Sequence, residues 1–247
     1  MKPKFTSKLG VLAQPARTTS SRGRSLVAGI IGLLAVCVSS HWNIASAQGG
    51  SDAAAGNQDI TTINMEPGQV MLEFVGQMID VPTALPRSNQ FGYLSFIKGV
   101  EPIFFFPLPN EATALFRFSV QATTTQELTN GPLRIITRKG TMSIFFNRCP
   151  LCLSPSADFA NPDSPVAAIL IQISTLRQQV IVDTEAQTLT EVNVNTITDT
   201  RPFMLGSTQF ELGQVGQVFR ASLIGRLDPV SLTKGYFAGY AVGVATQ

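Results

Sequence analysis

Residues 166–198 carry the pattern that most restricts how this chain can fold. They read VAAILIQISTLRQQVIVDTEAQTLTEVNVNTIT, in which two alternating segments flank a polar turn at residues 183–187. Alternation of apolar and polar residues with a period of two is typical of a β-strand with one buried face. The segment therefore predicts a long antiparallel hairpin, with residues 166–183 as its first arm and residues 188–198 as its second.

The first arm of this hairpin is too long for one regular strand, because at about 3.3 Å per residue it would span nearly 60 Å. Its apolar residues also change parity, since Ile169, Ile171 and Ile173 are odd-numbered whereas Leu176 is even-numbered. A shift of one residue exchanges the two faces of a strand. We therefore expect a β-bulge or a bend between Ile173 and Gln179.

Further strand patterns recur along the chain, and no segment shows a sustained helical period. Asn130-Gly131 is the strongest turn signal, because both central residues of a type I′ hairpin turn have positive φ. We expect Gly140 to bend or split its strand. Glycine and alanine dominate one face of the last segment, which suits a tightly curved strand or a close approach to a bulky group. The expected strands cover residues 70–79, 91–98, 114–125, 133–147, 166–183, 188–198, 215–228 and 235–245.

These segments predict an all-β, antiparallel domain of about eight strands. An up-and-down barrel would pair every strand edge without helices, and eight strands is a common barrel size. A two-sheet β-sandwich is the alternative, because it produces similar local patterns. In layout the chain resembles lipocalin-type barrels and the small barrels of the allene-oxide-cyclase and dirigent types. The resemblance covers residues 70–245 as a pattern of strands and carries over no functional residue.

Residues 1–47 have the features of a secretory signal peptide. Basic residues precede an apolar run at residues 25–40, which is shorter than the ~20 residues that a transmembrane helix needs. Ala45-Ser46-Ala47 then supplies the small-residue pattern of a cleavage site. An uncleaved anchor is one alternative interpretation of this segment, and a lipid attached to Cys37 is another.

Cleavage would leave a flexible lead-in at residues 48–64 and a single all-β domain at residues 65–247. We expect this product to be secreted, either periplasmic or extracellular, and to meet a membrane only through its signal segment. Six of the 18 basic residues and none of the 16 acidic ones lie in the leader, so the net charge changes from +2 to −4. The basic balance of the full chain therefore does not indicate nucleic-acid binding.

Cleavage would also remove His41 and Trp42, the only histidine and the only tryptophan of the chain. Without histidine, the secreted protein cannot build a Ser-His-Asp triad, a Cys-His site or a histidine metal cage. Its two remaining cysteines, Cys149 and Cys152, form a single C-x-x-C pair, whereas a structural zinc site needs about four ligands. We expect a local disulfide from an oxidising compartment, with no metal site and no cofactor.

A few side chains stand out as candidates for contact with a ligand. Glu73 and Arg117 each lie in an apolar strand, where a charge on the inward face would need a partner. The alternation around Arg117 favours the outer face instead. Three consecutive phenylalanines between prolines would form either a plug at the end of the core or a lip at the barrel mouth. The candidate ligand-contacting residues are Glu73, Tyr93, Arg117, Phe104, Phe105 and Phe106.

Three functions remain open at this point. The favoured one is non-catalytic binding of a small apolar ligand or a protein partner, because the chain has no G-x-S-x-G, P-loop or G-x-G-x-x-G motif. The second is a cofactor-free cyclase, isomerase or dirigent-like protein that positions a substrate in an apolar lumen. The third is an outer-membrane β-barrel, against which the irregular strand pattern argues. The sequence does not indicate an oligomeric state.

Overall fold

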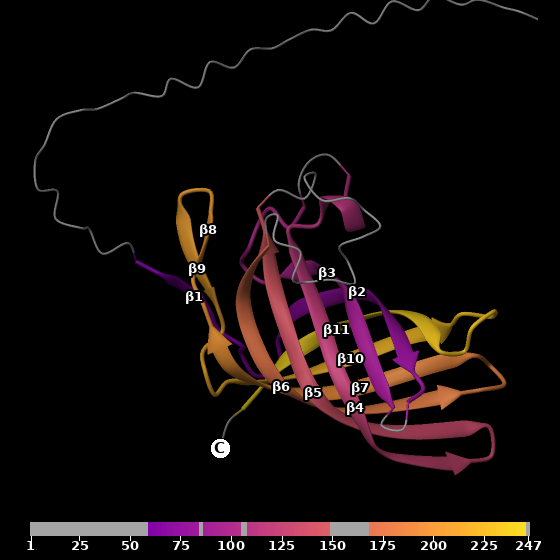
Figure 1. Ribbon diagram of the computed structural model, residues 1–247. Helices are drawn as coiled ribbons and strands as arrows, with labels where there is room; N and C mark the ends of the chain where they lie inside the picture. The colour runs from indigo at the N-terminus through magenta and orange to yellow at the C-terminus, as the bar shows by residue number, and fades with distance from the viewer. Residues whose placement is uncertain (1–58, 84–85, 105–107, 149–167, 246–247) are drawn as a thin grey trace, which may run out of the picture. The chain divides into compact units, whose positions relative to one another are not determined.

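In a computed structural model, the chain forms a closed barrel of eight antiparallel strands (Figure 1). The structure describes residues 59–83, 86–104, 108–148 and 168–245. Consecutive strands are neighbours around the barrel in the order β2-β3-β4-β5-β6-β7-β10-β11, and β11 pairs back onto β2. The predicted all-β, eight-strand barrel is confirmed, and the sandwich alternative is wrong because the sheet closes on itself.

Strands β2, β3, β4 and β7 are longer than the sequence patterns indicate, whereas β10 is shorter. A separate three-stranded sheet has the order β1-β9-β8, in which β8 and β9 lie between β7 and β10 in the chain and β1 precedes β2. No helix in the described ranges is long and apolar enough to cross a membrane. The bounds are β1 (Thr61–Ile63), β2 (Val70–Val81), β3 (Arg87–Ile97), the 3₁₀ helix η1 (Glu111–Thr113), β4 (Phe116–Asn130), β5 (Leu133–Asn147), β6 (Ala168–Asp183), β7 (Thr188–Thr200), β8 (Phe203–Leu205), β9 (Thr208–Leu212), β10 (Val218–Leu227) and β11 (Lys234–Val244).

The β6–β7 hairpin matches the predicted one closely. Its pairing register with β7 shifts between Ile173 and Ser174, where Thr198 of β7 is the extra residue. Within β6 itself the two faces exchange at Ile171 and Gln172, which are both buried, slightly before the predicted interval between Ile173 and Gln179. A second shift, between Ile144 and Phe145, occurs on the β5 side of β6. These two irregularities let one strand of 16 residues follow the curvature of the barrel.

The turn between β4 and β5 differs from the predicted type I′ turn. Asn130 still belongs to β4 and pairs with Leu133, so the two loop residues are Gly131 and Pro132. Gly131 has a φ of 59°, whereas the proline ring holds φ near −65°. Positive φ at the first central position only is the type II′ pattern. Gly140 does not split the strand, because β5 is continuous from Leu133 to Asn147.

Two aromatic clusters organise the core. Phe118 packs against Phe74, with ring centroids 5.3 Å apart, and against Phe237, at 6.2 Å. The second cluster joins the small sheet to the barrel, because Phe203 of β8 contacts Phe116 of β4 at 5.5 Å. β1, which lies within the predicted lead-in, pairs with β9 of this same small sheet.

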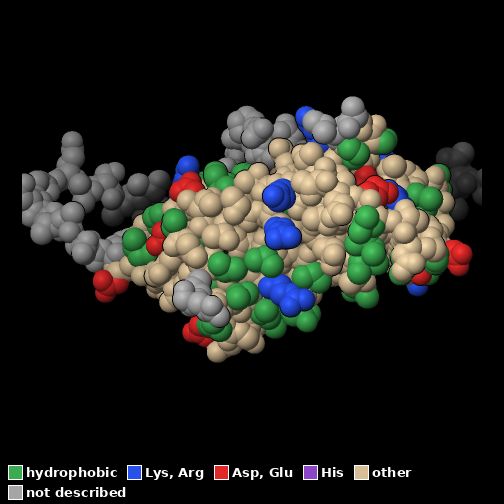
Figure 2. Space-filling view, turned by 90° about the horizontal axis from the view of Figure 1, so that it is seen from below, with side chains coloured by type: hydrophobic (Ala, Val, Ile, Leu, Met, Phe, Trp, Pro, Cys, Tyr) green, Lys and Arg blue, Asp and Glu red, His purple; other side chains and the backbone are tan. Residues whose placement is uncertain are grey.

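The inner face of the barrel is not uniformly apolar. On β7 the polar side chains point inward, so that Glu191 is fully buried while Val194 is 43% exposed. β3 begins four residues earlier than predicted because Ser88 and Gln90 face this polar interior. On the outside, one face is mostly neutral, with Lys and Arg side chains in its middle (Figure 2). The buried polar residues of the barrel strands include Ser88, Gln90, Arg138, Ser174, Gln178, Glu191, Asn193 and Asn195.

A row of small residues crosses one side of the barrel. Phe237 is paired with Gly225 and Gly76, and Gly76 is in turn paired with Gly92. A Cβ atom at Gly76 would lie 2.8 Å from the Phe118 ring, well inside van der Waals contact. Because these glycines have no side chain, the strands can approach the aromatic core closely. The predicted close approach along β11 is found at Gly239, where a Cβ atom would lie 2.1 Å from a β10 carbonyl oxygen.

Candidate functional site

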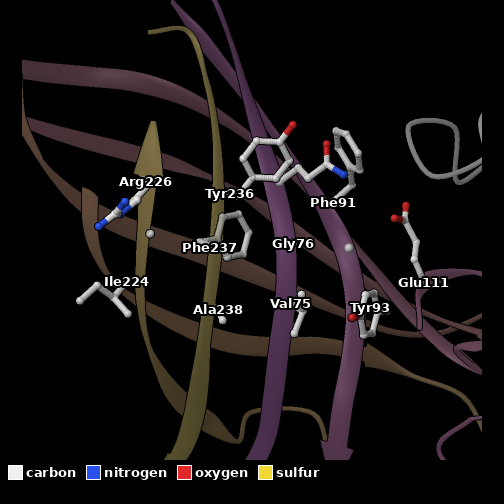
Figure 3. Close-up of a pocket in the computed structure, with 13 residues that line it drawn as sticks. Val75, Gly76, Phe91, Tyr93, Glu111, Ile224, Arg226, Tyr236, Phe237 and Ala238 are labelled. Atoms are coloured by element: carbon white, nitrogen blue, oxygen red, sulfur yellow. The ribbon is translucent and has the colours of Figure 1, made fainter. Parts of the chain in front are cut away.

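A groove of about 540 Å³ lies on the outer wall of the barrel, across β10, β11, β2 and β3 (Figure 3). This volume is within the range of small-molecule sites, about 300–1,000 Å³. Two outward-facing rows of side chains form its sides. One row runs from Ile224 through Ala238 and Val75 to Tyr93. The other runs from Arg226 through Tyr236 and Gln77 to Phe91.

The floor of the groove is the glycine row described above. Gly225, Gly76 and Gly92 all line it, and they lie between the two outward rows in the register of the sheet. Because the sheet is drawn inward at these positions, the outer surface is hollowed there. The same residues that close the strands onto the core therefore also create the groove.

Two groups with shifted pKa values, Tyr93 and Glu111, lie at one end of the groove. Burial raises the pKa of the Tyr93 hydroxyl, and the negative charge of Glu111 raises it further. Burial likewise raises the pKa of the Glu111 carboxyl, which the positive charge of Arg117 opposes. Tyr93 is therefore protonated at neutral pH, and it lines the groove. Figure 3 shows Tyr93 and Glu111 at this end and Ile224 and Arg226 at the opposite end.

The structure brings three of the sequence-predicted candidates together. Arg117 is the register partner of Tyr93, and Phe104 packs edge-on against the Tyr93 ring at 6.0 Å. All three lie on the outer wall, since Arg117 alternates with the inward-facing Phe116 and Phe118. Arg117 is only 8% exposed even so. Its outward direction agrees with the prediction from alternation, whereas its burial was not predicted.

The other sequence-predicted candidates do not contribute to this groove in the described ranges. Glu73 is exposed on the outer face of β2, beside Tyr240 of β11 and Phe96 of β3. Glu73 therefore does not face the lumen, because its neighbours Leu72 and Phe74 occupy the inward positions. Phe105, Phe106, Cys149 and Cys152 lie outside the described residues.

A buried polar network inside the barrel is a second site. The side-chain amide of Gln90 donates to one carboxylate oxygen of Glu191 at 2.7 Å, and Asn193 donates to the other at 2.8 Å. Asn195 in turn donates to Asn193 at 2.6 Å. The chain of amides extends along β7, so the inward face of one strand builds most of the network.

Arg138 is the cation of this network. Its side chain is 2% exposed and forms an ion pair with Asp80, with Nη2 2.7 Å from the carboxylate oxygen. Burial raises the pKa of Glu191, and the positive charge of Arg138 acts in the opposite direction. Gln178 also favours the charged form of Glu191, although its amide atoms have no partner in full hydrogen-bond geometry.

The described part of the lumen leaves little room beside this network. A cavity of about 10 Å³ lies between the aromatic cluster and the polar residues, lined in part by Phe118, Gln90 and Asn193. One water molecule needs about 10–15 Å³, so the cavity is far too small for an organic ligand. The expected apolar, ligand-sized lumen is therefore not found among the described residues.

The charge state of Glu191 leads to a pH prediction. Because its pKa is raised in the folded state, the folded protein holds this proton more tightly than the unfolded chain, and stability falls as pH rises through the raised pKa. Glu191→Gln has no such proton. The free energy of unfolding of Glu191→Gln relative to wild type is therefore expected to increase from about pH 4.5 upward, as measured by urea denaturation across a pH series. A difference that stays constant with pH would contradict this assignment.

The sequence shows the alternation that builds the polar network, but it does not show which face of the strand points inward. Glu191, Asn193 and Asn195 alternate with Val192 and Val194, which separates two faces without telling which one is inside.

Within the described ranges, no cluster of three or more His, Cys, Asp or Glu residues could hold a metal ion. Comparison of the chain with family models, curated proteins and solved structures finds no match.

Proposed function

We propose that the protein is a secreted, non-catalytic barrel that binds a small, mainly apolar ligand on its outer wall. The observation that carries this proposal is the difference in volume between the outer groove and the cavity in the lumen. The outer groove measures about 540 Å³, whereas the described lumen cavity measures about 10 Å³. A small organic molecule fits the first space and not the second.

The lining of the groove indicates the chemistry of the ligand. Tyr236 and Tyr93 offer aromatic rings, and Ile224 and Val75 offer aliphatic surface. Tyr236 is 56% exposed and Ile224 is 70% exposed, so the apolar surface is open to a ligand. The hydroxyl of Tyr93 adds a polar group at one end. A ligand with an aromatic ring and one polar group suits this combination.

The exterior of the barrel favours this proposal over an outer-membrane barrel. Lys139, Arg177 and Arg220 are exposed on the outer faces of three different barrel strands. Lysine or arginine on the lipid face costs about 2–4 kcal/mol at the membrane midplane. Three such side chains would interrupt the apolar band that a membrane barrel needs.

A cofactor-free cyclase or isomerase remains the second candidate, and Glu191 favours it. A fully buried carboxyl with a raised pKa is a typical general acid or base. A substrate would reach it only if the lumen opened, since the described cavity has room for about one water. Turnover that is lost in Glu191→Gln would support this candidate over the binding protein.

Ala238→Trp tests the binding proposal. Ala238 is exposed at the middle of the groove, so an indole there fills the groove without entering the core. The neutral fluorescent probe N-phenyl-1-naphthylamine is expected to bind the wild type, with fluorescence enhancement as the readout. The variant should bind it at least tenfold more weakly, because the contact surface is already occupied.

Thr175→Trp is the matched control, since Thr175 is exposed on β6, away from the groove. It should bind the probe as the wild type does. Equal loss in both tryptophan variants, or probe binding that Ala238→Trp leaves unchanged, would rule out the groove as the site. Thermal unfolding of both variants shows whether the fold is retained.

A further inference from the structure

Four basic side chains lie in one line across the outer wall of the barrel, away from the groove. Residue pairing joins Arg87 of β3 through Thr123 to Lys139 of β5, and Lys139 directly to Arg177 of β6. The same line continues through Val194 of β7 to Arg220 of β10. We refer to Arg87, Lys139, Arg177 and Arg220 as the basic row.

The basic row is long, narrow and free of nearby acidic partners. It spans five strand spacings, or roughly 24 Å at about 4.8 Å per spacing. All four side chains are exposed, and none forms an ion pair with a carboxylate in the described ranges. Lys and Arg side chains follow one another across the middle of the face in Figure 2. Four unpaired positive charges in a line therefore face solvent.

Neutral hydrogen-bonding groups border the basic row on one side. The adjacent outward line of paired residues consists of hydroxyl and amide side chains as far as β7: Asn89, Gln121, Thr141, Thr175 and Thr196. At the β3 end, the two lines enclose a hollow of about 890 Å³ that contains both Arg87 and Lys139. This hollow holds no acidic side chain among its lining residues.

The shape and chemistry of this surface select one class of partner. A single line of cations on a curved wall matches a linear polyanion better than a flat membrane, which would need a broad basic face. Nucleic-acid strands are held by aromatic stacking together with cations, and the two lines contain no aromatic side chain. Hydroxyl and amide groups beside charges instead suit sugar hydroxyls beside carboxylates.

We propose that the basic row is a binding surface for an acidic polysaccharide, with the uronate carboxylates on the four cations and the sugar hydroxyls on the Thr, Asn and Gln line. This surface is separate from the outer groove and does not depend on what the groove binds. It also gives a protein with a net charge of −4 after the expected cleavage a local site for an anion. Such a contact is electrostatic and must weaken with salt.

The test measures binding of polygalacturonate to the purified protein by isothermal titration calorimetry at 50 and 200 mM NaCl. Lys139→Gln/Arg177→Gln/Arg220→Gln removes three charges of the row. The matched control is Lys98→Gln/Arg201→Gln/Lys234→Gln, which removes the same charge elsewhere. Lys98 and Arg201 belong to exposed ion pairs that contribute little to stability, so the control fold is retained.

We expect the row variant to bind polygalacturonate at least tenfold more weakly and the control within twofold of wild type. Wild-type affinity is expected to fall about tenfold or more between the two salt concentrations. Neutral dextran should not bind. Equal loss in both variants, or no binding by the wild type, would overturn the proposal. Tighter binding to an oligothymidylate or to phosphatidylglycerol vesicles, lost in the row variant, would overturn the polysaccharide assignment in favour of that partner.

Discussion

Replacing Arg138 with methionine is expected to lower the free energy of unfolding by about 3–5 kcal/mol. Arg138 is 2% exposed and pairs with Asp80 at 2.7 Å, and its charge also favours the ionised form of the buried Glu191. Methionine fills similar space but leaves both carboxyls without a positive partner. The substitution thus removes one partner of a buried ion pair and leaves the other charge in place. This costs more free energy than replacing both partners together.

Urea denaturation at neutral pH measures this loss, and Arg134→Met is its matched control. Arg134 forms an ion pair of nearly the same length with Glu127, at 2.8 Å, but its side chain is 40% exposed. Exposed pairs are worth about 0–1 kcal/mol, so the control should lose no more than that. If both variants lost the same amount, burial would not distinguish the two pairs, and the importance of the internal network would be refuted.

Replacing Gly92 with alanine is expected to cost about 3 kcal/mol or more, at or above the upper end of ordinary overpacking. A Cβ atom at Gly92 would lie 2.1 Å from the carbonyl oxygen of Val75 and 2.6 Å from the Cα atom of Gly76. These are backbone atoms, so no rotamer change relieves the clash. β2 and β3 must separate, and the groove floor must move outward with them.

Thermal and urea unfolding measure the cost at Gly92, and Gly131→Ala is its control. At Gly131 the added methyl group meets nothing within 4 Å, and the penalty is limited to a positive φ of 59°. That penalty is roughly 1–2 kcal/mol. A Gly92→Ala protein that remains as stable as Gly131→Ala and still binds N-phenyl-1-naphthylamine would show that the glycine row does not shape the groove.

The polar lumen shows why part of the candidate site could not be predicted. Glu73 and Arg117 stand out in the sequence because each interrupts an apolar strand, and the alternation around Arg117 favours the outer face. Both lie on the outer wall, and the charged residues inside are Glu191 and Arg138. The alternation of polar and apolar residues around Glu191 does not show which face of the strand is inside, because the pattern has the same period of two whichever face is buried.

The outer groove could not be predicted for a different reason. Its sides come from β10, β11, β2 and β3, which are adjacent only because β11 closes the barrel onto β2. Tyr93 is among the residues that the sequence analysis names, whereas Glu111, Tyr236 and Ile224 carry no signal of their own. Residues from distant segments become one surface only when the register between strands is known.

The sequence by itself determined the eight barrel strands, although not their exact ends, and the hairpin at residues 166–198, because these follow from local alternation and turn chemistry. It did not indicate the small sheet of β1, β8 and β9. It also predicted an up-and-down barrel, which pairs every strand edge. Only the tertiary structure decided which face of each strand is inside and how filled the lumen is. Those properties depend on strand pairing and on close packing around Phe118, and no local pattern records them.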